Sequence, residues 1–190
     1  KSEIKYHGRP LIDFINLYKK GNEDSEIVLA LNKLEDMPEI FKGIKDKIKI
    51  VFGETQKVLS MADIAVVASG TATLEAAILA KPMVVIYKSN FISNFILSNF
   101  FLKSKYISLP NILSQSEIVP ELRQNKVTGL EILSKVNSVF LSQSKIINQL
   151  SSLKDNLSVN DSAKFSRAIK KLILEWTLSL QELTKQVEEV

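Results

Sequence analysis

Residues 64–77 read Ile-Ala-Val-Val-Ala-Ser-Gly-Thr-Ala-Thr-Leu-Glu-Ala-Ala, which joins a short apolar run to a series of small residues. The run of residues 64–68 is typical of a strand that is buried on both faces of a sheet. Ser69 and Gly70 have small side chains, so the backbone there can approach a ligand closely. Residues 71–79 favour a helix, which Pro82 ends. The stretch therefore predicts a strand that turns sharply into a helix.

Apolar runs on either side of this stretch predict that the strand has neighbours. We expect further strands at residues 27–31, 48–52 and 83–87. Helices are expected between them, at residues 34–47 and 55–61. Strands that alternate with helices indicate an α/β fold, with a parallel sheet covered by helices on both faces.

The rest of the chain divides into parts by its patterning. Residues 1–26 read as a linker or a remnant of a preceding part, and residues 27–160 as one α/β domain. Two amphipathic helices are predicted near the end, at residues 129–152 and 162–189, with residues 155–161 between them. The second of these, within residues 161–190, is expected to pack back on the domain or on a partner.

Composition excludes some classes of function. The 190-residue chain has no cysteine, so disulfides and thiolate metal sites are impossible. Its formal net charge is +4, carried by lysines that are spread along the chain. Because the sequence has no dense basic run interleaved with aromatic residues, nucleic acid is not an expected partner. The apolar stretch of residues 91–102 is shorter than the roughly 20 residues that a membrane-spanning helix needs.

The turn after residues 64–68 has the chemistry of an anion site. Helix amino termini bind phosphate because their unpaired N–H donors and the helix dipole both favour negative charge. Ligands of open parallel sheets also collect at the carboxyl ends of strands, where this turn lies. Glu75, on the same helix, can accept hydrogen bonds from both hydroxyls of a ribose. In the structural alternative, Ser69 or Thr71 merely caps the helix and Glu75 complements its dipole.

Four motifs then follow in a characteristic order. After residues 68–77 come Lys-Pro-Met-Val-Val-Ile-Tyr-Lys at 81–88, Tyr-Ile-Ser-Leu-Pro-Asn-Ile-Leu at 106–113 and Glu-Ile-Val-Pro-Glu-Leu at 117–122. This ordered set closely resembles the C-terminal domain of the lipid-A-disaccharide synthases. Residues 6–13 look like a variant of that family's Gly-His-Pro-Leu segment.

The resemblance implies a GT-B glycosyltransferase, in which two Rossmann-like domains face each other across a cleft. The second domain, which this chain would supply, binds the sugar nucleotide. The family reaction is inverting and transfers 2,3-diacylglucosamine from its UDP derivative to 2,3-diacylglucosamine 1-phosphate, with release of UDP. It uses no catalytic metal, so we expect no metal and no other cofactor. Preorganised N–H donors and a helix dipole suit this chemistry because negative charge develops on the departing phosphate.

The family's motifs also imply roles for residues of this sequence. By position, Ser69, Gly70 and Thr71 would contact the diphosphate of the UDP-sugar donor. Glu75 would bind the ribose, and Asn111 would line the donor side of the cleft. The catalytic base is not identified. Weaker candidates, each of which can equally be structural, are Tyr87, Glu117 and Glu121.

The resemblance also implies partners and a location. The partners are the UDP-sugar donor and an acylated glucosamine phosphate acceptor, with the protein in the cytoplasm or peripheral at the inner membrane. The aromatic stretch of residues 91–101, beside Lys103 and Lys105, suits contact with acyl chains or a membrane surface. Its alternative is a helix packed on the sheet or on a partner. The C-terminal helix is expected to cross the cleft or to exchange with a second subunit in a homodimer.

The sequence departs from the family in several places. Arg9 replaces the histidine of the Gly-His-Pro-Leu segment, and the Gly-Ser-Arg loop before residues 27–31 is absent. Residues 114–116 stand where an arginine usually follows the Pro-Asn pair, and the N-terminal domain of the family has no counterpart here. A partial chain is one interpretation, and a non-catalytic or degenerate binding module that retains the fold is the alternative. His7, the only histidine, reads as a surface or loop residue.

Overall fold

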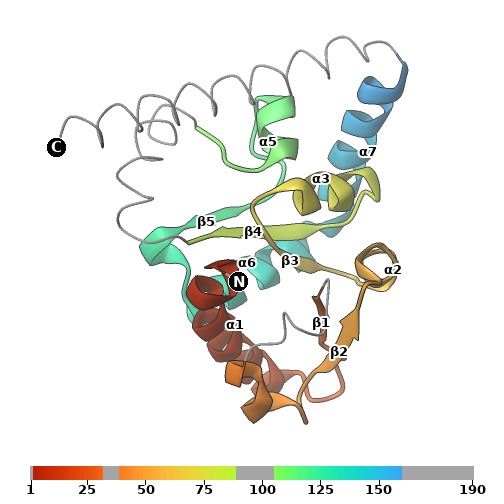
Figure 1. The fold of residues 1–190 in the computed structure, drawn as a ribbon. Helices are drawn as coiled ribbons and strands as arrows, with labels where there is room; N and C mark the ends of the chain where they lie inside the picture. Colours follow the sequence, from red (N-terminus) through yellow and green to blue (C-terminus); the bar gives the residue numbers. More distant parts are fainter. Residues whose placement is uncertain (1, 32–38, 89–104, 160–190) are drawn as a thin grey trace, which may run out of the picture.

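The computed structural model describes residues 2–31, 39–88 and 105–159, in which helices surround parallel strands (Figure 1). The strands belong to two sheets, a pair β1-β2 and a trio in the order β3-β4-β5. The pairing is parallel in both sheets. The Rossmann-like α/β class predicted from the sequence is therefore confirmed.

The three-stranded sheet is the central layer of the molecule. It consists of β3 (Ala65–Ala68), β4 (Met83–Tyr87) and β5 (Glu121–Arg123). The last residue of β3 pairs with Ile86, and the last residue of β4 pairs with the last residue of β5. The carboxyl ends of the three strands therefore meet at one edge, which we call the carboxyl edge. The first four residues of β4 are at most 1% exposed, as expected of a central parallel strand covered on both faces.

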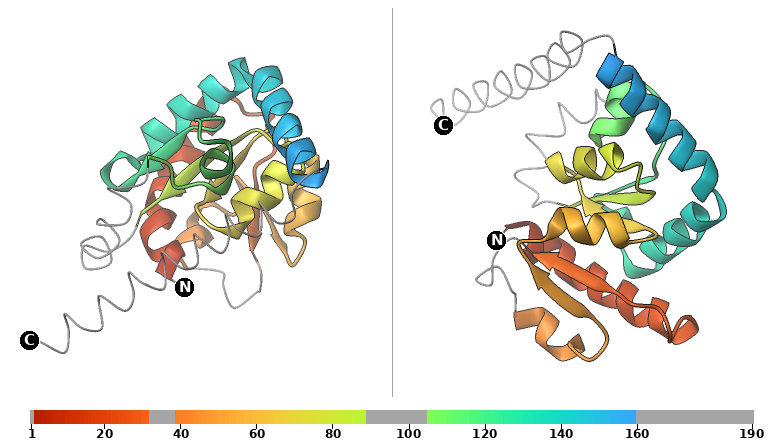
Figure 2. Two further views of the ribbon diagram at one scale, coloured as in Figure 1. Left: turned by 90° about the horizontal axis from the view of Figure 1, so that it is seen from above. Right: turned by 90° about the vertical axis from the view of Figure 1, so that its right-hand side faces the viewer.

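Helices cover both faces of this sheet (Figures 1 and 2). On one face lie α3 (Thr71–Ile78) and α5 (Leu109–Ser114), with α7 (Gln143–Val159) packed against both. On the other face lies α6 (Gly129–Leu141). The hydroxyl of Thr128 accepts a hydrogen bond of 3.2 Å from the backbone N–H of the third residue of α6. This side-chain cap fixes where α6 begins.

A long helix, α1 (Ser2–Gly21), packs lengthwise against α6. The two backbones approach closely at Gly129, where an added Cβ would lie 2.6 Å from the nitrogen of Phe14 and 2.7 Å from the Cβ of Asp13. Only glycine fits at such a crossing. The sequence had not predicted this helix, because Pro10 in its middle disfavours helical structure. Burial of its apolar face against α6 outweighs that local preference.

The second sheet lies beside the first and is less buried. It pairs β1 (Val28–Leu31) with β2 (Lys49–Phe52). The 3-10 helix η2 (Glu39–Ile44) precedes β2, and α2 (Thr55–Met61) follows it. A further 3-10 turn, η3 (Gln124–Lys126), follows β5. Within the described ranges β1 and β2 do not join the central sheet by hydrogen bonds, whereas the sequence pattern had suggested one continuous sheet. Apolar runs indicate buried strands but carry no information on which strands pair.

Two helix boundaries predicted from the sequence are wrong. The helix predicted at residues 129–152 ends at Leu141, and the next helix runs on to Val159, through the segment expected to separate two helices. The break falls at Ser142, whose hydroxyl donates a hydrogen bond to the carbonyl oxygen of Ser138 (2.8 Å). Such a side-chain bond competes with helix continuation. Of the helix predicted at residues 34–47, the described part contains only the 3-10 helix η2.

His7 is the third correction. The sequence predicts a surface or loop position for this residue, but His7 lies within α1 and is only 5% exposed. Gly8 and Pro10 make the segment resemble a loop, since both residues disfavour helices when tertiary packing is ignored. The fold instead places the only histidine of the chain in the interior.

Two further predictions lie outside the described residues. These are the aromatic stretch of residues 91–101 and the C-terminal helix of residues 162–189. In the part of the chain that the structure describes, none of the helices has the length and apolar character that a membrane crossing requires.

Candidate functional site

The candidate site begins with the turn between β3 and α3, at the carboxyl edge. Ser69 is fixed there by two bonds: its N–H donates to the carbonyl oxygen of Ile86 (2.9 Å), and its hydroxyl donates to that of Ile107 (2.9 Å). The first bond continues the β3–β4 ladder by one residue. The second ties the turn to the segment before α5. Ser69 is therefore already occupied by protein groups, and its role here is to hold the turn in place.

Gly70 and Thr71 form the open part of the turn. Both are exposed, and an added Cβ on Gly70 would meet no described protein atom within 4 Å. Gly70 occupies the cap position of α3 and supplies no side-chain acceptor to the first amides of the helix. Its carbonyl oxygen instead accepts bonds from the amide and the hydroxyl of the buried Thr73, at 3.1 and 2.7 Å. The amide of Thr73 is therefore occupied, whereas among the described residues the amides of Thr71 and Ala72 have no acceptor and can donate to an anion.

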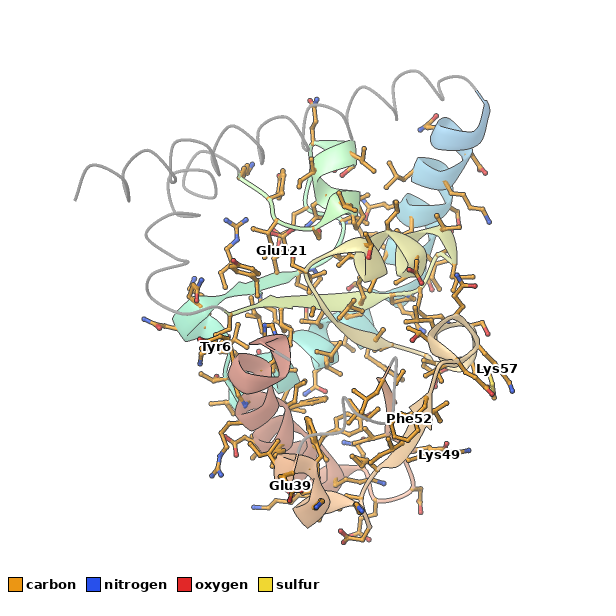
Figure 3. All side chains as sticks on the ribbon, in the orientation of Figure 1. Tyr6, Glu39, Lys49, Phe52, Lys57 and Glu121 are labelled. Atoms are coloured by element: carbon orange, nitrogen blue, oxygen red, sulfur yellow. The ribbon has the colours of Figure 1, made fainter. Side chains whose placement is uncertain are left out.

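A buried carboxylate organises the neighbouring part of the carboxyl edge. Glu121, on β5, accepts hydrogen bonds from the backbone N–H of Ile107 (2.9 Å) and of Ser108 (2.8 Å). Its Oε1 also accepts from the hydroxyl of Ser108 (2.7 Å). Arg123 pairs with the other oxygen at 2.9 Å, and the Glu121 side chain is only 6% exposed. In Figure 3 Glu121 lies between β5 and α5. Because these bonds are charge-assisted, they hold the segment before α5 firmly against β5.

Asn111 extends this network into the interior. Its side chain is fully buried, and its Nδ2 donates to the carbonyl oxygen of Val119 (2.8 Å) and to Glu121 (2.9 Å). Its Oδ1 accepts from the N–H groups of Ile118 (2.8 Å) and Val119 (3.0 Å). These bonds use both ends of the amide. Asn111 therefore positions α5 and the strand start, and direct contact with a ligand stays a prediction.

Ser69 and Glu121 are connected through one residue. The carbonyl oxygen of Ile107 accepts from Ser69, while its N–H donates to Glu121. A single peptide segment thus joins the open turn of β3 to the buried carboxylate of β5. Sequence spacing could not reveal Ile107, because it contributes only its backbone.

A shallow hollow of about 470 Å³ opens beside the network, at the end of β5. Lys105, Glu117 and Lys126 are exposed residues in its wall. The Nζ of Lys105 lies 5.3 Å from the centre of the Tyr106 ring, a cation–π distance. Arg123 and Glu121 also line the hollow but neutralise each other. Because Glu117 offsets only one of the two lysines, the hollow remains net positive. A positive hollow at the carboxyl edge attracts anionic ligands.

The predicted site residues therefore fall into groups. Gly70 and Thr71 form the open turn, and the half-buried Glu75 follows one turn later on α3. Glu117 and Glu121 meet at the hollow, and the half-buried Tyr87 ends β4 beside Arg123. Arg123 is not among the residues predicted from the sequence, although it lies only two residues after Glu121. Among the described residues, no group of three or more metal-ligating side chains is placed to hold a metal ion.

Fold and site together define a Rossmann-like α/β domain with an open strand-to-helix turn at the carboxyl edge of its central sheet. Comparison with known protein families matches residues 1–174 to the family described as lipid-A-disaccharide synthetase. The chain belongs to the lipid-A-disaccharide synthase family. Members of this family are glycosyltransferases of lipid A biosynthesis.

Curated relatives agree with this match. A lipid-A-disaccharide synthase of Cellvibrio japonicus is 35% identical, over 86% of this chain and 41% of the relative. That of Colwellia psychrerythraea is 33% identical, over 85% of this chain and 43% of the relative. Lipid-A-disaccharide synthase 1 of Legionella pneumophila (strain Paris) is 34% identical, over 83% of this chain and 42% of the relative. The matches thus span less than half the length of these relatives.

Proposed function

We propose that this chain binds the donor substrate of lipid A disaccharide synthesis, UDP-2,3-diacylglucosamine. The whole protein would transfer the sugar to 2,3-diacylglucosamine 1-phosphate and release UDP. The observation that carries the proposal is the open turn at Gly70 and Thr71, where a strand of the central sheet passes into α3. Membership of the family supports the choice of substrate.

The diphosphate of UDP would lie against this turn. The first amides of α3 would donate to its oxygens, and the helix dipole would favour its negative charge. Gly70 allows close approach because the space over its Cα is empty of described protein atoms. The lysines of the hollow, Lys105 and Lys126, would add long-range attraction.

Other residues of the site would act on the ligand or on the turn. Glu75, half-buried on α3, would accept hydrogen bonds from the ribose hydroxyls. Ser69, Asn111 and Glu121 would act through the backbone, because their polar atoms already hold the turn and the segment before α5. Rigid placement of donors before the reaction is what makes them effective in catalysis.

In the proposed reaction, a hydroxyl oxygen of the acceptor bonds to the anomeric carbon of the donor sugar. The bond from that carbon to the diphosphate oxygen breaks, and the hydroxyl proton passes to a general base. The amides at Gly70 and Thr71 would stabilise the charge that develops on UDP. The acceptor site, a location in the cytoplasm or at the inner membrane, and a homodimer belong to the same proposal.

A charge placed at the turn tests donor binding. Thr71→Asp puts a carboxylate at the start of α3, which suits the helix dipole but repels a diphosphate. We expect UDP affinity, measured by calorimetry on the full chain, to fall at least about tenfold, while the melting temperature is kept. Thr55→Asp makes the same change at the start of α2 and should leave UDP affinity unaltered. Equal affinity of wild type and Thr71→Asp for UDP would contradict the proposal.

A second candidate is a nucleotide-binding module without transferase activity. It is favoured by the occupied hydroxyl and amide of Ser69, which leave fewer groups for the diphosphate. Incubation of the protein with both lipid substrates separates the two candidates. Stoichiometric release of UDP with formation of the disaccharide supports the transferase, and UDP binding without either product supports the module.

A further inference from the structure

His7 connects α1 to the carboxyl edge. Its Nε2 accepts a hydrogen bond of 2.9 Å from the backbone N–H of Lys88, the residue that follows β4. The two residues are separated by 81 positions in the sequence. His7 is 5% exposed, so the contact lies in the interior. Tyr6, the neighbour of His7, is seen near the end of β4 in Figure 3.

The end of β4 is the strand end next to the open turn. Two residues before Lys88, the carbonyl oxygen of Ile86 accepts from the N–H of Ser69, which anchors the turn. Between them, Tyr87 is paired with Arg123 of β5. The bond from His7 therefore holds the next peptide along β4, directly beyond the one that fixes Ser69. Movement of Lys88 would be transmitted to the turn through β4.

The bond has a chemical requirement. A ring nitrogen accepts a hydrogen bond only when it carries no proton, so His7 must be neutral, with its proton on Nδ1. Protonation makes both nitrogens donors, and the N–H of Lys88 then faces another N–H. Histidine changes charge between pH 5 and 8. The contact is therefore present while the ring is neutral and is lost as the pH falls.

Two ion pairs lie on the elements around His7. On α1 itself Arg9 pairs with Asp13 at 3.3 Å, and on η2 Lys42 pairs with Glu39. Further charges on the packed elements are the side chains of Lys88 after β4, Lys126 on η3, and Glu131 and Lys135 on α6. Protonation of His7 would place a positive charge in the interior, facing the N–H of Lys88, which adds the cost of burying a charge to the lost bond.

We propose that His7 is a positioning residue whose neutral imidazole holds the end of β4, and with it the open turn, in the form that binds UDP. Acidification would release this contact and weaken nucleotide binding. The ligand in this statement rests on the proposed function, whereas the coupling of His7 to the turn does not.

Nuclear magnetic resonance tests the coupling without any ligand. Because His7 is the only histidine, its ring nitrogens give unambiguous signals. We expect an unprotonated Nε2 at neutral pH, and a shift of the Lys88, Ser69 and Gly70 amides with the same midpoint as the ring. A protonated Nε2 at neutral pH, or a ring titration that leaves these amides unmoved, would overturn the inference.

Two variants then test the effect on binding. His7→Gln keeps an acceptor for Lys88 without titrating, whereas His7→Leu removes the acceptor. At pH 8 UDP affinity should be kept in His7→Gln and fall about fivefold in His7→Leu, the factor that ~1 kcal/mol of one hydrogen bond represents. Towards pH 5 the wild type should lose about fivefold more affinity than His7→Gln, a comparison that cancels the titration of UDP itself.

The outcomes separate the two proposals. Parallel pH profiles of wild type and His7→Gln would overturn the role of His7 and leave donor binding intact. Absence of UDP binding in every variant at every pH would overturn the proposed function, while the ring and amide titrations would still decide whether His7 positions the turn.

Discussion

In the described residues the chain passes twice from a parallel strand through a glycine-containing turn into a helix that begins with threonine. After β2 the turn is Gly53-Glu54 before Thr55, and after β3 it is Ser69-Gly70 before Thr71. In the first turn the cap residue is Glu54, whose carboxylate pairs with Lys57 at 2.9 Å. In the second turn the cap residue is Gly70, which places no side chain over the amides.

The local pattern of strand, glycine-containing turn and helix alone does not make an anion site. The carboxylate of Glu54 makes no hydrogen bond to the first amides of α2, but it places a negative charge at that helix start, whereas Gly70 places none at the start of α3. The surroundings differ as well. β2 belongs to the two-stranded sheet and is exposed or half-buried along its length, whereas β3 borders β4, whose first four residues are buried. Only the second turn is anchored by a network that reaches β5.

The largest expected effect comes from the difference in burial between the two sheets. Ile86→Ala removes a side chain that is 1% exposed, whereas Ile50→Ala makes the same change on the half-buried β2. We expect the free energy of unfolding to fall by ~3 kcal/mol for the first and by ~1 kcal/mol for the second, measured by urea denaturation. Equal losses of unfolding free energy in the two variants would show that the two sheets contribute equally to stability, which would contradict the difference in burial described above.

A smaller effect should follow from the network that anchors the second turn. Glu121→Gln keeps the shape of the side chain but removes the charge that accepts from Ile107, Ser108 and Arg123. We expect the free energy of unfolding to fall by ~2 kcal/mol, since hydrogen bonds to a buried charge are lost. Glu117→Gln, on an exposed residue of the same hollow, should change it by less than ~0.5 kcal/mol.

Unfolding of these two variants in urea gives the comparison directly. A loss in Glu117→Gln as large as that in Glu121→Gln would mean that the buried network does not anchor the turn. UDP affinity provides a second comparison of the two variants. It should fall in Glu121→Gln only, because only that change is expected to loosen the segment that holds Ser69.

Much of the central fold followed from the sequence alone. The helix of residues 55–61 and the strand of residues 83–87 have the predicted bounds, and the strand of residues 64–68 differs by one residue. These segments are predictable because burial on both faces demands continuous apolar runs, and because small residues such as those at 69–71 permit the sharp turn between strand and helix.

The elements that escaped prediction are those whose stability comes from distant contacts. α1 is helical despite Pro10, because it packs on α6 at Gly129, far along the chain. β5 is only three residues long, which is too short for a pattern of apolar and polar residues to reveal a strand. Glu121 anchors the turn through the backbone N–H groups of Ile107 and Ser108. Every residue type other than proline has such a group, so the sequence gives no signal for these bonds. His7 likewise reaches Lys88 only through the packing of α1.

The central claim is that the amides at the start of α3 receive a diphosphate. Amide hydrogen exchange of the full chain with and without UDP tests it most directly. We expect slower exchange at Gly70, Thr71 and Ala72 when UDP is added, with no change at the matching turn of residues 53–55. Unchanged exchange at all three amides under saturating UDP, or equal protection of both turns, would contradict it.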